Sequence, residues 1–157
     1  MCQDKNDGFI FPYGIKLEDN GLIQSFPAME IFLPYKDGGL LSFIFLIDSG
    51  ASISALPKSD APALGIDYKK GGKIFVSGIN GEPITAFRHK INAVFKNETV
   101  KLPLLFMSND NAPRVLGREG IFNKFTIVFE EENQRSGFIK KTAKHAGEIK
   151  KILDLFV

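Results

Sequence analysis

The sequence predicts a mostly β domain in which about nine short strands close into a barrel, accompanied by one or two short helices. Apolar runs rich in β-branched and aromatic residues recur at short intervals, and Gly, Pro, Asn and Asp separate them. Asp37-Gly38-Gly39 and Asn80-Gly81 each lie between two extended arms, which is a strong signal for a β-hairpin. The 15 Phe residues and the absence of Trp suit a compact β core.

The 157 residues are enough for one domain with a substantial core. The polar residues 1–8 are expected to form a disordered tail. Residues 9–140 are expected to form the β domain, and residues 141–157 a C-terminal helix. No internal repeat or low-complexity segment divides the chain further.

Three stretches are expected to be helical. Pro57–Leu64 favours one or two helical turns that end at a glycine. A short helix is predicted directly after Gly117, because apolar residues at 121, 122 and 125 fit one helical face. The last stretch, residues 141–157, has apolar residues at i, i+3, i+4 and i+7 among lysines, which is typical of an amphipathic helix. We expect this helix to pack on the barrel or on a subunit; binding to a membrane surface is the less favoured alternative. These apolar residues are Ile149, Ile152, Leu153 and Phe156.

Composition excludes several classes of function. The formal charge of +2, from 20 basic and 18 acidic residues, gives no electrostatic case for a nucleic-acid partner. Cys2 is the single cysteine, which excludes an intramolecular disulfide and a cysteine metal cluster. His89 and His145 lack ligand-like spacing, so neither a metal nor another cofactor is expected. No secretory signal is recognisable, so a cytoplasmic location is the default, unless an upstream signal was removed and Cys2 is lipidated.

The segment with the clearest chemical meaning begins with a run of large apolar residues, Phe43–Ile47, and ends in Asp48, Ser49 and Gly50. The run is too short for a membrane span and is typical of a strand buried on both faces. A carboxylate at the end of such a strand lies near the core, where ionisation is costly unless donors surround it. Gly50 permits a tight turn, and the small Ser49 and Ala51 leave room for a ligand. An ordinary Asx turn is the alternative.

Two further segments follow in a suggestive order. The hairpin tip Gly78-Ile79-Asn80-Gly81 is followed by Val115-Leu116-Gly117-Arg118. Together with Asp48-Ser49-Gly50-Ala51, they resemble the retropepsin-like aspartic proteases, which include retroviral proteases and single-domain cellular and bacterial homologues. The resemblance implies a closed-barrel acid-protease fold and an activity that needs no cofactor.

The resemblance implies an aspartic endopeptidase that is active as a homodimer on peptide or protein substrates. Pepsin-like enzymes carry two such motifs in one chain, whereas this chain has one, so Asp48 would require the Asp48 of a second chain. Two carboxylates at close range would share one proton and activate a water. Asp48, Ser49 and Gly50 would be catalytic, with Ser49 hydrogen-bonded across the dimer.

The resemblance also assigns residues around the substrate. A flap at residues 78–81 would close over an extended peptide, and apolar side chains, Phe106 among them, would line its pockets. The implied substrate-binding residues are Ala51, Val76, Gly78, Ile79, Asn80, Gly81 and Ile84. The implied structural support behind the catalytic loop consists of Val115, Leu116, Gly117 and Arg118.

Three departures from the family pattern have physical consequences. Ser49 replaces the commoner Thr and removes a methyl contact between subunits. Ala51 lacks the hydroxyl that pepsin-type enzymes often place there, so the carboxylate is less stabilised and the working pH is expected nearer to weakly acid or neutral. Ser52 stands where retroviral enzymes often carry an acidic partner for Arg118. Arg118 is therefore expected to pair with Glu119 or Asp60.

Two alternatives belong to other functional classes. A catalytically silent retropepsin-like domain could serve as a dimerisation or peptide-binding module, and the test against it is cleavage of peptides. An unrelated β-barrel that binds a small ligand would be a stable monomer with a closed pocket, and sedimentation would separate it from the other two hypotheses.

Overall fold

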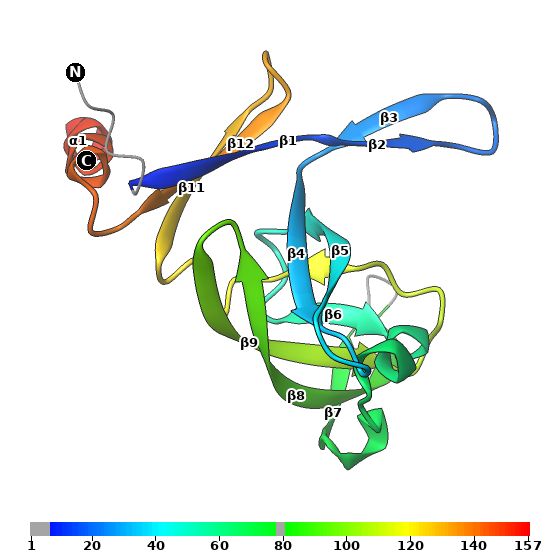
Figure 1. Cartoon of the computed structure of the whole chain (residues 1–157). Helices are drawn as coiled ribbons and strands as arrows, with labels where there is room; N and C mark the ends of the chain where they lie inside the picture. Colours follow the sequence, from blue (N-terminus) through cyan, green and yellow to red (C-terminus); the bar gives the residue numbers. More distant parts are fainter. Residues whose placement is uncertain (1–6, 78–80) are drawn as a thin grey trace. The chain divides into compact units, whose positions relative to one another are not determined.

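The computed structural model describes residues 7–77 and 81–157, which form two compact units (Figure 1). The larger unit comprises residues 29–121. The smaller unit comprises the residues up to 28 together with residues 122–157. Cys2 and most of the expected flap tip lie outside the described residues.

The larger unit is a sheet whose strands close into a ring. The strand order is β4-β5-β10-β6-β9-β8-β7, and β4 also pairs with β8, so six strands form the ring and β7 extends it. The predicted mostly β, closed arrangement is therefore confirmed. The strands are β4 (Ala28–Pro34), β5 (Leu40–Ile47), β6 (Ser54–Pro57), β7 (Gly72–Ser77), β8 (Pro83–Phe95), β9 (Glu98–Met107) and β10 (Val115–Leu116).

The core of this unit follows from the alternation along its strands. In β4, Met29, Ile31 and Leu33 are fully buried, and the intervening residues are partly or fully exposed. The strand β9, which lies between β6 and β8 in the sheet, is buried continuously from Leu102 to Met107, so the side chains on both of its faces are covered. A strand covered on both faces has no place for polar side chains, which explains its continuous apolar sequence.

Turn residues end these strands where the sequence predicts. Gly38 and Gly39 connect β4 and β5 with φ angles of 96° and 81°, which only glycine adopts without strain. The 3-10 helix η1 (Lys58–Leu64) follows Pro57 and ends at Gly65, whose φ is 65°. A further 3-10 turn, η2 (Tyr68–Lys70), precedes β7.

The short helix predicted after Gly117 does not form. Residues 118–124 lie in a bend and turns instead. Gly120 has a φ of 87°, a left-handed conformation that interrupts a right-handed helix. The apolar spacing of residues 121, 122 and 125 was therefore a misleading signal. Phe125 in fact begins the next strand.

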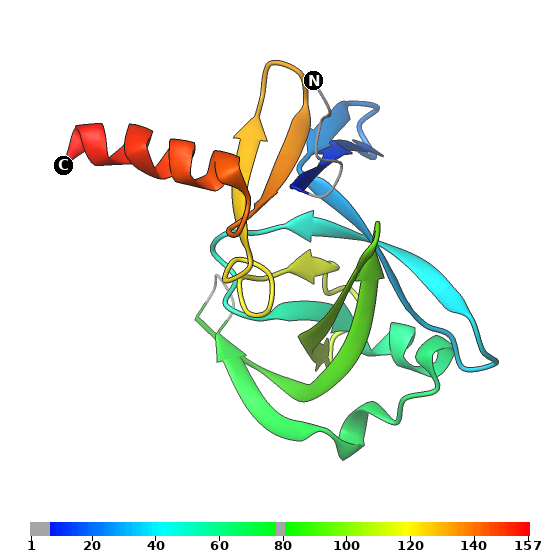
Figure 2. The same ribbon diagram turned by 60° about the vertical axis from the view of Figure 1, so that its left-hand side comes forward.

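The smaller unit contains a three-stranded antiparallel sheet, a separate two-stranded hairpin and the C-terminal helix (Figure 2). The sheet has the order β1-β12-β11, and the hairpin pairs β2 with β3. The amphipathic helix predicted near the C-terminus is confirmed. The elements are β1 (Gly8–Pro12), β2 (Gly14–Leu17), β3 (Ile23–Phe26), β11 (Phe125–Glu130), β12 (Arg135–Lys140), α1 (Lys144–Leu153) and η3 (Asp154–Phe156).

Aromatic side chains hold the three-stranded sheet together. The Phe138 ring meets the Phe11 ring edge to face at a centroid distance of 5.3 Å and the Phe125 ring at 6.0 Å. All three side chains are buried. Such pairs add to the free energy of area burial by about 0.5–1.5 kcal/mol each. No helix within the described ranges is long and apolar enough to cross a membrane.

Shortening a buried side chain of β9 should lower the free energy of unfolding. Leu102→Ala removes a fully buried side chain from the larger unit, so we expect a loss of about 2–5 kcal/mol in the free energy of unfolding, measured with urea. Lys101→Ala, the exposed neighbour on the same strand, is the control and should change stability by less than about 0.5 kcal/mol. Equal losses in the two variants would contradict the placement of β9 in the core.

Candidate active site

Asp48 lies directly after the buried end of β5. Its backbone N–H donates to the Leu116 carbonyl at 3.0 Å. The residue as a whole is partly buried, and Oδ1 accepts a hydrogen bond from the Gly50 N–H at 2.8 Å. The Ala51 N–H donates back to the Asp48 carbonyl at 3.2 Å. The strand therefore ends in an Asx turn, and this turn holds the carboxylate in place through a backbone donor.

The two residues after Asp48 are exposed. A Cβ atom on Gly50 would lie 3.1 Å from Oδ1 of Asp48, so any other residue would crowd the carboxylate. The Ser49 side chain is at the tip of the turn, where it can reach a molecule outside this chain. The turn thus presents a carboxylate, a hydroxyl and an uncovered backbone together.

The segment around β10 holds this turn from behind. Val115 and Leu116 pair in parallel with the end of β5, and Val115 also pairs with Ala55 of β6. The Arg118 N–H donates to the Ala51 carbonyl at 2.9 Å, and the Glu119 N–H donates to the Ser52 carbonyl at the same distance. The structure therefore brings the predicted support segment against the loop at residues 48–53.

Gly117 lies very close to the backbone of Ile53. A Cβ atom on this residue would lie 2.4 Å from the Ile53 carbonyl carbon, so only glycine fits. Its N–H donates to Oγ of Ser54 at 3.0 Å, and Ser54 is fully buried. Sequence reasoning missed Ser54. A serine between apolar neighbours on a short buried strand was the available signal, since a buried hydroxyl needs a partner.

Arg118 is not paired as the sequence suggested. Its Nη2 lies 3.4 Å from Oγ of Ser52, which is a long hydrogen bond. The expected pairing with Glu119 is wrong, because Glu119 bonds to Nη2 of Arg88 at 2.6 Å. The guanidinium of Arg88 reaches Glu119 from β8, 31 residues away in the sequence.

The alternative pairing with Asp60 is also wrong. Asp60 receives two hydrogen bonds of 2.8 Å from the guanidinium of Arg114. This bidentate contact with Asp60 raises the pKa of Arg114, although partial burial acts in the opposite direction. The guanidinium also lies 5.2 Å from the centroid of the Phe43 ring. Arg114 thus ties η1 to the segment that leads into β10.

An apolar wall lies next to the loop. Val76 of β7 pairs directly with Ile84 of β8. Both side chains are partly buried, and together with Ile53 they pack against a buried cluster formed by Ala86, Leu105 and Met107. The structure therefore brings together two of the predicted substrate-binding residues, and it adds Ile53, which sequence reasoning did not single out.

The hairpin tip between these strands is described only in part. Gly81 has a φ of 77°, which agrees with an Asn-Gly turn signal. The remaining predicted flap residues, Gly78, Ile79 and Asn80, lie outside the described residues.

Phe106 does not belong to the candidate site. Its side chain is fully buried, and its ring packs edge to face against His89 with a centroid distance of 5.3 Å. The expectation that it lines a substrate pocket is therefore wrong. On a strand covered on both faces, sequence alternation cannot tell which apolar side chain borders a cleft.

The comparison with protein families gives a clear result. The model of the family described as "gag-polyprotein putative aspartyl protease" matches residues 38–120, which is more than half of the chain. The chain belongs to the retropepsin-like aspartic protease family. The matched range contains the Asp48 turn, both arms of the β7–β8 hairpin and the support segment around Gly117.

A solved structure has the same fold. A retropepsin-like aspartic protease from Rickettsia conorii has 21% sequence identity and a TM-score of 0.56, and the match covers 83% of this chain and 97% of that one. EIAV protease complexed with the inhibitor HBY-793 has 22% identity over 59% of this chain and 82% of that chain. Its TM-score of 0.44 is too low to establish a common fold. No curated protein matches the sequence.

Membership of the retropepsin-like family excludes one of the hypotheses drawn from the sequence. The hypothesis of an unrelated ligand-binding β-barrel is wrong.

Within the described residues, no group of three or more His, Cys, Asp or Glu side chains is placed to hold a metal ion.

The contact between Gly117 and Ile53 gives a test of the retropepsin-like core. Gly117→Ala would place a methyl group inside the Ile53 backbone, so we expect a loss of about 1–3 kcal/mol in the free energy of unfolding. Gly72→Ala is the matched control, because an added Cβ there meets no atom within 4 Å. Unchanged urea unfolding of Gly117→Ala would show that the two segments are not in contact.

Proposed function

We propose that this chain is an aspartic endopeptidase that works as a homodimer, in which each chain supplies one Asp48. The observation that carries the proposal is the turn at the end of β5, where the Gly50 N–H donates to one carboxylate oxygen of the partly buried Asp48, beside the exposed Ser49. Family membership supports the same reaction class.

The requirement for a second chain follows from the chemistry. The mechanism needs two carboxylates with different protonation, and the chain has a single Asp-Ser-Gly sequence. A two-fold axis places the same residue of both chains at equal distances from the axis. In a dimer with the two Asp48 turns facing each other, the carboxylates share one proton, because two adjacent negative charges are costly.

The two carboxylates then have separate tasks. The ionised Asp48 removes a proton from a bound water, and the oxygen of that water attacks the carbonyl carbon of the scissile peptide bond. The protonated Asp48 donates a hydrogen bond to the carbonyl oxygen and stabilises the charge that develops there. Collapse of the tetrahedral intermediate breaks the C–N bond, and a proton passes to the leaving amine.

The neighbouring residues position the substrate in this proposal. Ser49 hydrogen-bonds to the opposite loop and keeps the two carboxylates coplanar. Gly50 and Ala51 expose the backbone along which an extended peptide runs. Residues 78–81 close over that peptide as a flap. The apolar wall that includes Val76 and Ile84 favours apolar substrate side chains.

The support segment has an indirect role. Val115 and Leu116 fix the end of β5 through the sheet, and Gly117 and Arg118 fix the loop that follows. A shift of about 1 Å in this loop would misplace both carboxylates, since the two loops are related by symmetry. These four residues therefore position the catalytic groups and do not touch the substrate.

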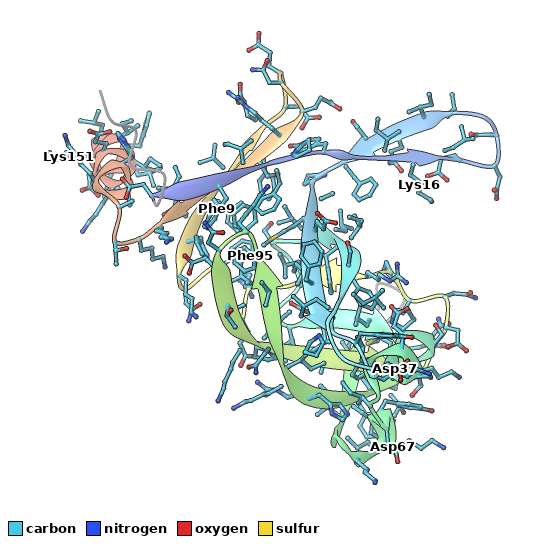
Figure 3. The ribbon with its side chains drawn as sticks, in the orientation of Figure 1. Phe9, Lys16, Asp37, Asp67, Phe95 and Lys151 are labelled. Carbon is cyan, nitrogen blue, oxygen red and sulfur yellow. The ribbon has the colours of Figure 1, made fainter. Side chains whose placement is uncertain are left out.

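Replacing the carboxylate tests the reaction. Asp48→Asn should lower the cleavage of an unfolded protein or a peptide library by about 10²–10⁴-fold or more, because no group can act as base on the water. Asp37→Asn is the matched control, since Asp37 is exposed in the β4–β5 turn (Figure 3). Activity that survives in Asp48→Asn would rule out the shared-proton pair. Absence of activity in the unchanged chain at every pH would favour a silent peptide-binding module.

The pH dependence tests the role of Ala51. The rate should fall in acid, where the pair of Asp48 side chains loses its one negative charge, and in alkali, where it loses the shared proton. With no hydroxyl at position 51, the optimum should lie between weakly acid and neutral pH. Ala51→Ser should move the optimum to lower pH, and Ala51→Gly should not. A pH–rate profile of the unchanged chain with an optimum below about pH 3 would contradict this prediction.

A further inference from the structure

The β2–β3 hairpin carries an apolar face that is open to solvent. Leu17 pairs directly with Ile23, and Ile15 lies two residues before Leu17, so these three side chains share one face of the hairpin. Their exposed fractions are 75% for Ile15, 70% for Leu17 and 73% for Ile23. The opposite face carries the paired Lys16 and Gln24.

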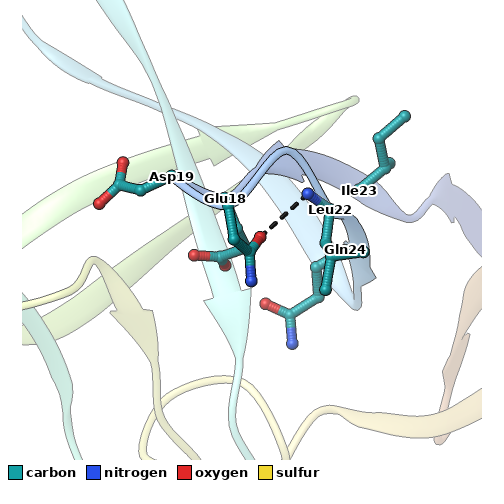
Figure 4. Close-up of a pocket in the computed structure, with 6 residues that line it drawn as sticks. Glu18, Asp19, Leu22, Ile23 and Gln24 are labelled. Carbon is teal, nitrogen blue, oxygen red and sulfur yellow. Dashed lines mark hydrogen bonds between the residues drawn. The ribbon is translucent and has the colours of Figure 1, made fainter.

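This hairpin needs a covering surface. An isolated two-stranded hairpin is at best marginally stable in water, and a contiguous exposed apolar face usually marks an interaction site. In the turn of the hairpin, Leu22 is also 65% exposed, and its N–H donates to Oδ1 of Asn20 at 3.0 Å. A shallow hollow beside the turn is lined by Leu22 and Ile23 together with Glu18, Asp19, Asn20 and Gln24 (Figure 4).

The helix α1 and the turn η3 carry a second open apolar face. Ile149, Ile152, Leu153 and Phe156 lie on one side of the helix. Ile152 is 56% exposed, Leu153 60% and Phe156 82%. Gly147 lies on the opposite side by the helical period.

The two apolar faces belong to opposite ends of the smaller unit. Figures 1 and 3 show the hairpin with Lys16 at one end and α1 with Lys151 at the other, and β1 runs between them. The strand β1 is paired along its length with β12, which leads into α1. The hairpin follows the Pro12 end of this pairing and α1 follows the Ile139 end, so the two elements leave the sheet at opposite ends, and in one chain both apolar faces stay exposed.

Charge favours contact between the two faces. The hairpin segment, residues 14–26, has two carboxylates and one lysine, and Nζ of that lysine, Lys16, lies 3.0 Å from Glu18. Asp19 remains as an exposed negative charge at the turn. Residues 140–157 have five lysines and two carboxylates. Opposite net charges steer two surfaces together and oppose self-pairing of either one.

We propose that the β2–β3 hairpin of one chain packs on the apolar face of α1 in a second copy of the chain. A two-fold axis repeats the contact, so both hairpins and both helices are covered in a dimer. The inference rests on the proposed homodimeric function and adds the surface that holds the dimer. Both elements lie outside residues 38–120, the range that the family model matches.

Sedimentation of paired variants tests the contact. Ile23→Glu and Leu153→Glu each place a charge in an apolar face, and each should raise the dissociation constant of the dimer by about tenfold or more. The matched controls carry the same new charge on the opposite faces, Gln24→Glu on β3 and Gly147→Glu on α1, and should leave the constant unchanged. Dimers that tolerate Ile23→Glu and Leu153→Glu as well as the controls would overturn the inference.

Cross-linking identifies which surfaces meet. In a Cys2→Ser background, Ile23→Cys and Leu153→Cys are prepared separately, mixed in equal amounts and oxidised. The disulfide should join the two different variants, and neither variant should cross-link alone to a comparable extent. Cross-linking of Ile23→Cys with itself, or no cross-link in a sample that sediments as a dimer, would overturn the inference and leave the proposed reaction intact.

Two further results distinguish a failure of the proposed homodimer from a failure of this contact alone. If the unchanged chain sediments as a monomer at concentrations where it cleaves peptides, both the homodimer and this contact are wrong. If Leu153→Glu abolishes binding to vesicles of anionic phospholipid but leaves the dimer unchanged, α1 is a membrane-surface helix, and the inference is again overturned. A dimer with the hairpin-to-helix disulfide and the two sensitive variants supports it.

Discussion

The position of Asp48 depends on the hydrogen bonds that join two segments nearly 70 residues apart in the sequence. The short strand β10 inserts between β5 and β6, and the residues after it bond to the loop that follows β5. Gly117 approaches the Ile53 backbone and donates to the buried Ser54 hydroxyl. Because a buried N–H without a partner is costly, this bond makes the register of the two segments specific. The carboxylate is therefore placed by the sheet and not by the turn alone.

Charged side chains around this core have structural roles that the sequence did not reveal. Arg114 donates two hydrogen bonds to Asp60, and its guanidinium lies over the ring of Phe43. Arg88 donates a hydrogen bond to Glu119. Each pair links strands or turns that are distant in sequence. Exposed pairs contribute little stability individually, but a bidentate arginine contact restricts orientation as well as distance. Arg118 is left with a long bond to Ser52.

In our proposal each chain supplies one carboxylate of the catalytic pair, so the chain has to form a dimer before it can catalyse the reaction. A two-fold axis then imposes one geometry on both carboxylates, so any residue that orders one loop orders both. In our proposals, the larger unit provides the reaction and the smaller unit provides surfaces for a second copy. The apolar faces of the β2–β3 hairpin and of α1 are unusual for a chain that acts alone, because exposed aliphatic residues normally occur singly.

Local chemistry in the sequence determined the hairpins, the Asp48 turn, η1 and α1, because glycine conformations, proline positions and helical periodicity act over a few residues. It also determined the family, through motifs in a particular order. Tertiary structure decided what those signals could not. Gly120 in a left-handed conformation ended the expected helix after Gly117, and burial on both faces of β9 removed Phe106 from the site. The tertiary structure also decided the hydrogen-bond partners of Arg88, Arg114 and Ser54. Contacts between distant segments exist only once the sheet has closed, so they leave no local pattern in the sequence.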